Sequence, residues 1–94
     1  MRKIEQEMLA AIKDGKTWHK GNTAVTYQRS PCADVFLHGN HICEVVQLYS
    51  ETHCNANLDT FRRWPTRTTV SRLRALGINA SVRKGIPMID GKPI

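Results

Sequence analysis

The sequence predicts an α+β domain in which a single small antiparallel sheet of four to six short strands is packed by two helices. Apolar residues recur at helical spacing near the start of the chain and again in its last third. Between and after these segments, short stretches of alternating apolar and polar residues are separated by glycine-containing turns, as in antiparallel hairpins. Residues 1–94 are expected to form one domain, because a chain of 94 residues has room for one modest core.

The first helix is expected over residues 3–13. Gly15 suits the left-handed position that commonly follows a helix end. The apolar stripe of this helix consists of Ile4, Met8, Ala11 and Ile12. A strand is expected next over residues 23–28, and Ser30-Pro31 should break it.

A hairpin follows, and Gly39-Asn40 is its expected two-residue turn. This turn would place His38 opposite His41 and Leu37 opposite Ile42. One face of the hairpin should then belong to the core, although Glu44 interrupts it. The predicted core face comprises Ala33, Val35, Leu37, Ile42, Val46 and Leu48.

The other face of the hairpin brings histidine and cysteine together. It is expected to carry Asp34, Phe36, His38, His41, Cys43 and Val45. The chain has enough thiol and imidazole for a tetrahedral zinc site, but no cysteine pair has the usual knuckle spacing. We therefore expect reduced cysteines, no metal and no cofactor, and the two histidines as exposed cross-strand neighbours.

The polar residues 49–55 are interpreted as a connection and residues 56–61 as a short strand. A second helix should begin near Pro65, where three threonines offer capping hydroxyls, and end at Gly77. Its apolar seam is Val70, Leu73 and Leu76. The chain should close with a hairpin of residues 81–84 and 87–89 around Gly85, followed by a turn at Asp90-Gly91.

The charge is distributed unevenly along the chain. Residues 1–54 contain six basic and six acidic residues, whereas residues 55–94 contain eight basic residues against Asp59 and Asp90. The whole net charge of +6 therefore lies in the second half. This asymmetry favours an anionic partner, either nucleic acid, an anionic lipid surface or an acidic protein, over a merely solvated basic face. No stretch is long and apolar enough for a membrane span, and the N-terminus is no signal peptide, so a soluble cytoplasmic protein is expected.

The start of the second helix is the first candidate site. Cations are unfavourable at a helix N-terminus, and a bound phosphate would reverse that effect. The alternative is that a threonine caps the helix and the arginines are solvated. The residues that would contact the phosphate are Arg62, Arg63, Thr66, Arg67, Thr68 and Thr69.

The outer face of the same helix is the second candidate. With the apolar seam turned inward, Arg67, Ser71 and Arg74 should lie on the opposite side and Arg72 on a flank. The third candidate is the basic turn at Arg83-Lys84. For a protein partner, Trp64 would be the anchor, because interfaces favour tryptophan and arginine.

Catalysis is not expected. The sequence lacks a glycine-rich phosphate loop, a metal-binding HExxH helix and a convincing pair of nucleophile and base.

Two resemblances add to these predictions. Residues 68–78 followed by residues 79–94 are similar in order to the recognition helix and wing of winged-helix proteins. That fold needs another helix immediately upstream, where this sequence predicts a loop containing Trp64-Pro65.

The chain as a whole resembles small uncharacterised accessory proteins of tailed bacteriophages. The resemblance lies in the N-terminal helix, in LHGN at Leu37–Asn40, in a tryptophan before T-x-T-T-x-S-R-L at Thr66–Leu73, and in the strand pair at Arg83–Gly91. It implies a protein made in an infected bacterium. We therefore predict a non-catalytic phage accessory protein that binds nucleic acid, with DNA favoured. The alternative is an inhibitor or adaptor that docks on an acidic surface of a host protein.

Overall fold

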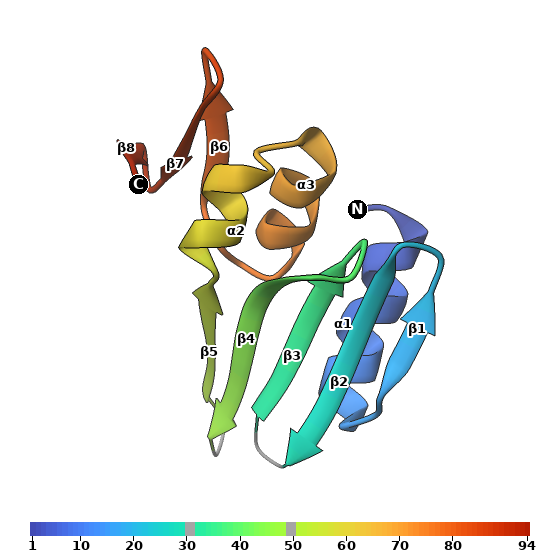
Figure 1. Ribbon diagram of the computed structural model, residues 1–94. Helices are drawn as coiled ribbons and strands as arrows, with labels where there is room; N and C mark the ends of the chain where they lie inside the picture. The colour runs from blue at the N-terminus through green and yellow to red at the C-terminus, as the bar shows by residue number, and fades with distance from the viewer. Residues whose placement is uncertain (30–31, 49–50) are drawn as a thin grey trace.

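The computed structural model describes residues 1–29, 32–48 and 51–94 (Figure 1). The helices are α1 (Lys3–Asp14), α2 (Leu58–Arg63) and α3 (Arg67–Ala75). The strands are β1 (Trp18–Lys20), β2 (Thr23–Arg29), β3 (Cys32–Leu37), β4 (Asn40–Leu48), β5 (Glu51–Ala56), β6 (Ala80–Arg83), β7 (Ile86–Ile89) and β8 (Lys92–Pro93). The predicted α+β class, with a small antiparallel sheet packed by helices, is confirmed.

The strands form two sheets. The first contains β1 to β5 in sequence order, all antiparallel, and α1 packs along one of its faces (Figure 1). Helices α2 and α3 cover one end of this sheet, and β6, β7 and β8 form the second sheet beyond them. The core joins both parts: its buried members are Met8, Ile12, Val25, Ala33, Val35, Leu37, Ile42, Cys43, Val45, Phe61, Leu73, Leu76 and Ala80.

The predicted first helix and the predicted strand over residues 23–28 are confirmed as α1 and β2. Gly15 ends α1 in the left-handed conformation, with φ of 67°. The short strand β1, which pairs Trp18 with Val25, was not predicted. The break expected at Ser30-Pro31 lies outside the described residues.

The turn of the β3–β4 hairpin lies one residue earlier than predicted. Its two central residues are His38 and Gly39, with φ of 52° and 78°, and Leu37 pairs with Asn40. A turn with two positive φ angles matches the twist of the flanking strands, and glycine in second place makes it accessible. The predicted pairs of His38 with His41 and of Leu37 with Ile42 are therefore wrong.

A β-bulge in β4 explains why Glu44 seemed to interrupt the core face. Phe36 pairs with His41 and Val35 pairs with Cys43, so Ile42 is the extra residue on its strand. Ile42 and Cys43 are consequently both buried, and Glu44 is exposed. The insertion reverses the alternation, so the rest of the strand presents the opposite set of side chains to the core.

Beyond the bulge, the predicted faces of β4 are exchanged. Cys43 and Val45 lie in the core and not on the outer face. Val46 is half-buried and Leu48 is 46% exposed, so neither is a core residue as predicted.

The segment between the hairpin and α3 differs from its prediction. Residues 51–55 of the expected connection belong to strand β5 (Glu51–Ala56), which pairs with β4. Residues 58–61 of the expected strand belong instead to helix α2, whose N-cap residue Asn57 accepts a hydrogen bond from the backbone N–H of Thr60. Asn57 also donates its own backbone N–H to the carbonyl of Ile42 at 2.8 Å, so the bulge in β4 positions the start of α2. Residues 49 and 50 of the predicted connection lie outside the described residues.

The C-terminal hairpin has the predicted strands and turns. Lys84-Gly85 joins β6 to β7, and Asp90-Gly91 joins β7 to β8. Among the described strands, these three pair with one another and with no other strand, so they form a sheet of their own. In the part of the chain that the structure describes, no helix is both long and apolar enough to cross a membrane.

Candidate functional site

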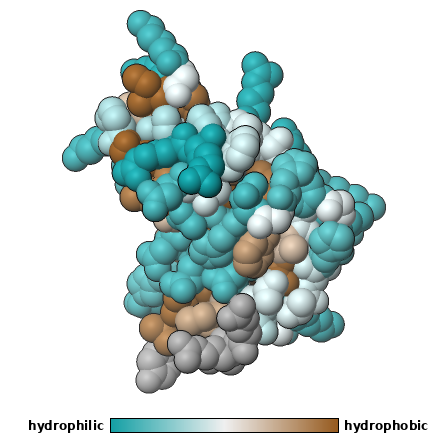
Figure 2. All heavy atoms as spheres, viewed as in Figure 1, coloured by the Kyte–Doolittle hydropathy of each residue, from teal (hydrophilic) through white to brown (hydrophobic). Residues whose placement is uncertain are grey.

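A basic groove runs between α3 and β6. Two arginines of α3, Arg67 and Arg74, stand seven residues apart on its helical wall, which is about 10 Å along the helix axis. Ser81 and Val82 of β6 form the opposite wall. The groove is completed by Pro65, Val70 and Ser71. Hydrophilic side chains cover the region of α2 and α3 on the face that Figure 2 shows.

The arginines of this groove have no acidic neighbour. Among the described residues, neither Arg67 nor Arg74 forms an ion pair, and both are exposed. Arg63 is likewise exposed and forms no ion pair within the described part of the chain, whereas Arg62 binds the Asp59 carboxylate at 3.0 Å. The groove and its rim therefore carry positive charge that the fold itself does not neutralise.

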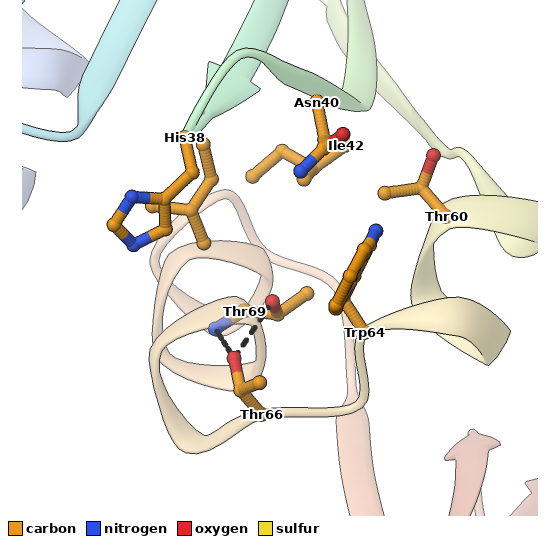
Figure 3. A pocket seen from close by; sticks show the side chains of 8 residues that line it. His38, Asn40, Ile42, Thr60, Trp64, Thr66 and Thr69 are labelled. Carbon is orange, nitrogen blue, oxygen red and sulfur yellow. Dashed lines mark hydrogen bonds between the residues drawn. The ribbon is translucent and has the colours of Figure 1, made fainter.

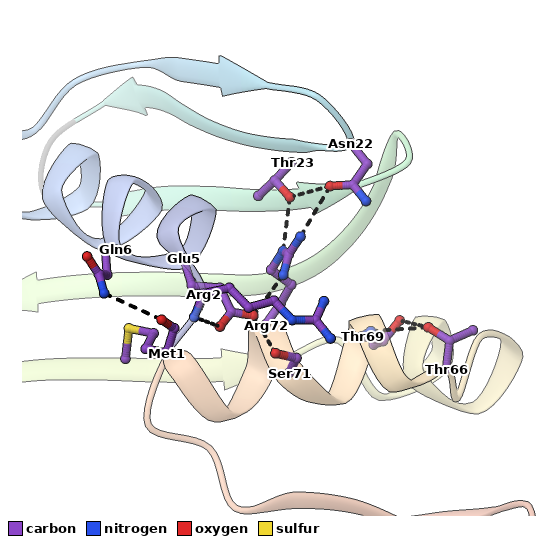
Figure 4. A network of polar contacts seen from close by, with 10 residues as sticks. All are labelled: Met1, Arg2, Glu5, Gln6, Asn22, Thr23, Thr66, Thr69, Ser71 and Arg72. Atoms are coloured by element: carbon purple, nitrogen blue, oxygen red, sulfur yellow. Dashed lines mark hydrogen bonds and ion pairs between the residues drawn. The ribbon is translucent and has the colours of Figure 1, made fainter.

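Arg72 does not belong to this surface. Its side chain is 3% exposed and points toward α1 and the start of β2 (Figure 4). Its Nη1 donates to Glu5 Oε2 at 2.7 Å, and its Nε donates to Thr23 Oγ1 at 3.0 Å. Nη2 donates to Asn22 Oδ1 at 3.3 Å. The prediction that Arg72 lies on an outer flank is wrong, because a buried carboxylate from the N-terminal helix holds it inside.

Ser71 is directed toward the same carboxylate. Its hydroxyl donates to Glu5 Oε2 at 2.5 Å, although the residue also borders the groove. Burial raises the pKa of Glu5, but the hydrogen bonds from Ser71 and Arg72 outweigh it, and the net pKa lies below its ordinary value of 4.5. Glu5 is therefore ionised at neutral pH. Ser71 acts chiefly in this internal network and not on the outer face as predicted.

A threonine side chain of the protein itself caps the start of α3. Thr66 is the N-cap residue, and its hydroxyl accepts the backbone N–H of Thr69 at 3.1 Å. The two threonine hydroxyls also lie 3.0 Å apart in a hydrogen bond, and Thr69 is buried. Capping by threonine, the alternative to phosphate contact, is what these two hydroxyls do. Thr68 is half-buried, and the charge at this end of the helix comes from Arg67.

A second, apolar pocket lies on the other side of the α2–α3 turn. It has a volume of about 220 Å³ and opens between that turn and the β3–β4 turn (Figure 3). Trp64 forms one wall and is 47% exposed. The pocket is lined by Leu37, His38, Asn40, Ile42, Thr60, Trp64, Thr66 and Thr69. Of these, the sequence had indicated Trp64, Thr66 and Thr69 for binding. The remaining residues were missed because nothing in the sequence places the β3–β4 turn beside α2.

The α2–α3 turn forms a ridge between the two hollows. Trp64 and Thr66 line the apolar pocket, whereas Pro65 and Arg67 line the basic groove. Alternate residues of this short segment therefore face opposite sides, and the two hollows are immediate neighbours. Such adjacency lets one extended ligand contact both.

The basic turn of the C-terminal hairpin projects from the small sheet. Arg83 and Lys84 are exposed there and form no ion pair among the residues that the structure describes. Lys84 adopts φ of 53° and Gly85 adopts φ of 79°, so both turn positions have positive φ. This geometry holds two adjacent cations at the tip of the hairpin that follows α3.

The order of α2, α3 and the hairpin bears on the winged-helix resemblance. The loop expected at Trp64-Pro65 is present, but it is only three residues long, and the segment before it is helix α2, which ends at Arg63. A helix, a tight turn, a second helix and a hairpin then follow one another, which is the order of a helix-turn-helix with a wing. The upstream helix that this order requires was not predicted from the sequence, and α2 occupies its place.

The histidine and cysteine side chains are not assembled into a metal site within residues 1–29, 32–48 and 51–94. Both ring nitrogens of His41 are engaged: Nε2 lies 2.9 Å from Asp34 Oδ1, and Nδ1 lies 3.0 Å from Asn57 Nδ2. Cys43 lies on the opposite, core face. His41 therefore ties the sheet to the cap of α2.

Cys43 and Cys54, on neighbouring strands, interact as free thiols. A hydrogen bond with Cys54, together with burial, raises the pKa of the Cys43 thiol. The same hydrogen bond lowers the pKa of Cys54 to about 7, although burial opposes it. Cys54 is accordingly the more readily ionised of the two.

The fold and the surface describe a small α+β protein with an exposed basic face that has no ion-pair partners among the described residues other than the Arg62–Asp59 pair. A family model described as Kyanoviridae Gp96 protein matches residues 1–92. The chain therefore belongs to this family of phage proteins, in agreement with the resemblance to phage accessory proteins. Neither a search of curated proteins nor a search of solved structures gave a match.

Proposed function

We propose that this phage protein binds nucleic acid, with DNA favoured, inside the infected bacterial cell and without catalysing a reaction. The observation that carries the proposal is the groove between α3 and β6, in which Arg67 and Arg74 have no carboxylate partner among the described residues. Arginine in an open groove is suited to phosphate oxygens, which dominate the affinity of nucleic-acid-binding proteins.

Two further features support the same proposal. Arg63, just before the α2–α3 turn, and Arg83 and Lys84 on the C-terminal hairpin are further exposed cations that could contact phosphates. The succession of α2, α3 and hairpin is the order in which winged-helix proteins present a helix and a wing to DNA.

The proposal is tested by measuring the affinity for DNA against salt concentration. For the wild type, the logarithm of the association constant should fall linearly with the logarithm of salt concentration, because bound cations are released from the phosphates. Arg67→Glu and Arg74→Glu should each weaken binding and reduce the slope by roughly one.

The matched control is Lys16→Glu, which makes the same change of charge at an exposed position remote from the groove. It should leave the slope nearly unchanged. If Lys16→Glu weakens binding as much as Arg67→Glu does, the groove is not the binding surface.

A second function is favoured by Trp64, a half-exposed tryptophan among arginines, which is the composition of protein-binding hot spots. In that function the protein docks on an acidic surface of a host protein. The purified protein would then have no measurable affinity for DNA. A host partner would be captured after nuclease treatment by the wild type but not by Arg67→Glu.

A further inference from the structure

We propose that the apolar pocket beside Trp64 binds one unpaired base of a nucleic acid, so that the ligand is single-stranded at this point. The inference rests on the proposed function and names the form of its ligand. Its geometry is independent of the arginines, because the pocket and the groove have different linings.

The shape and chemistry of the pocket suit an aromatic heterocycle. Leu37 and Ile42 give it an apolar floor, and the Trp64 indole stands at its side as a flat wall (Figure 3). Bases in single strands are held by stacking on such aromatic side chains. The lining is mostly apolar with a few polar groups, which is the composition of sites for small organic rings.

Polar groups border the pocket where the edge of a base would lie. The side chain of Asn40 is exposed at the mouth, and its amide offers both donors and an acceptor. Thr60 borders the pocket next to Trp64 and turns its methyl group toward the indole. Among the described residues the Asn40 side chain has no hydrogen-bond partner within the protein, so it is available to a ligand.

The charge around the pocket selects a base over an apolar protein side chain. Arg63 precedes Trp64, and Arg67 follows the turn and lines the adjoining groove. A strand that crosses the ridge at Pro65 would place its phosphates beside these arginines and one base in the pocket. A base can enter only when it is unpaired, because stacking and pairing cover its faces and edge in a duplex.

The test compares two short labelled oligomers by fluorescence anisotropy. One is an oligothymidylate, and the other is an abasic strand with the same number of phosphates. The wild type should bind the oligothymidylate more tightly than the abasic strand and more tightly than a duplex of equal length. Trp64→Ala should weaken binding of the oligothymidylate about five- to 150-fold and leave binding of the abasic strand unchanged.

Two variants separate stacking from folding. Trp64→Phe keeps an aromatic wall and should retain most of the preference for bases. Leu58→Ala removes another exposed apolar side chain of α2 that does not line the pocket, and it should behave as the wild type. In a Trp18→Phe chain, the remaining indole fluorescence should be quenched by the oligothymidylate and not by the abasic strand.

The outcomes distinguish the two proposals. If the wild type binds both single strands equally with a steep dependence on salt, or prefers the duplex, the base pocket is overturned and the nucleic-acid function stands. If the wild type binds no nucleic acid at all, both proposals fail. Loss of base preference in Leu58→Ala would also overturn the assignment to this pocket.

Discussion

The two sides of α3 carry the same residue type with opposite consequences. Arg72 faces inward and is held by Glu5, Thr23 and Asn22, whereas Arg74, two residues along the helix, is exposed and forms no ion pair among the described residues. The inner arginine therefore serves the stability of the fold, and the outer one remains available to a ligand. Neighbouring arginines on one short helix can therefore have different roles, one in the stability of the fold and one on the exposed surface.

Among the substitutions in α3, loss of the inward-facing arginine should reduce the stability of the protein most. Arg72→Met removes the only cation bound to a buried carboxylate among the described residues, and removing one partner of such a pair costs about 3–5 kcal/mol. Urea denaturation should show this loss in the free energy of unfolding. Adding Glu5→Gln to the same chain removes the orphaned charge and should restore part of the stability. A double variant as unstable as Arg72→Met alone would show that the pair is not the cause.

Low pH should reduce the stability that the Glu5–Arg72 ion pair contributes, because Glu5 becomes protonated. The folded protein holds the pKa of Glu5 below its ordinary value of 4.5, so the contribution of this group is fully present above 4.5. The contribution is lost as the pH falls from 4.5 through the lowered folded pKa. Denaturation midpoints measured across this window should decline more steeply for the wild type than for Glu5→Gln. Parallel declines would contradict the assignment.

Loss of the N-cap of α3 should have an intermediate effect on stability. Thr66→Ala removes the hydroxyl that caps α3 and should cost about 1 kcal/mol in the free energy of unfolding. Thr68→Ala is the control, because Thr68 lies in the same turn and does not cap the helix. It should change stability by less than about 0.5 kcal/mol. Equal losses in the two variants would mean that the cap contributes nothing.

The outer side should show the smallest effect on stability. Arg74→Ala removes an exposed side chain without an ion pair in the described part of the chain and should change the free energy of unfolding by less than about 0.5 kcal/mol. The same variant should bind DNA more weakly than the wild type. A stability loss comparable to that of Arg72→Met would erase the distinction between the two sides.

Local sequence patterns predicted the elements whose residues carry their own periodicity. The apolar stripe of α1, the threonine cap of α3 and the turn at Lys84-Gly85 were all foreseen. Strand β5 was not, because only Cys54 and Ala56 in it are even half-buried and its other residues are polar. Helix α2 was not predicted either, because its six residues are too few to show the apolar spacing of a helix.

The remaining differences depend on contacts between distant segments. The bulge at Ile42 reverses the faces of β4, and the sequence of the strand contains no signal that predicts a bulge at this position. Arg72 was expected outside because its partner, Glu5, lies 67 residues away in the sequence. The basic groove was half predicted, since Arg67 and Arg74 were named, but its β6 wall could come only from the fold.

The pairing of Glu5 with Arg72 also has a consequence for synthesis on the ribosome. The helix that carries Glu5 emerges first, and its carboxylate has no cation to accompany it into the core until the third helix has been made. Contacts of such long sequence separation form late and slow the folding of small domains. The nascent chain should thus leave α1 undocked through most of translation and close its core only near the end.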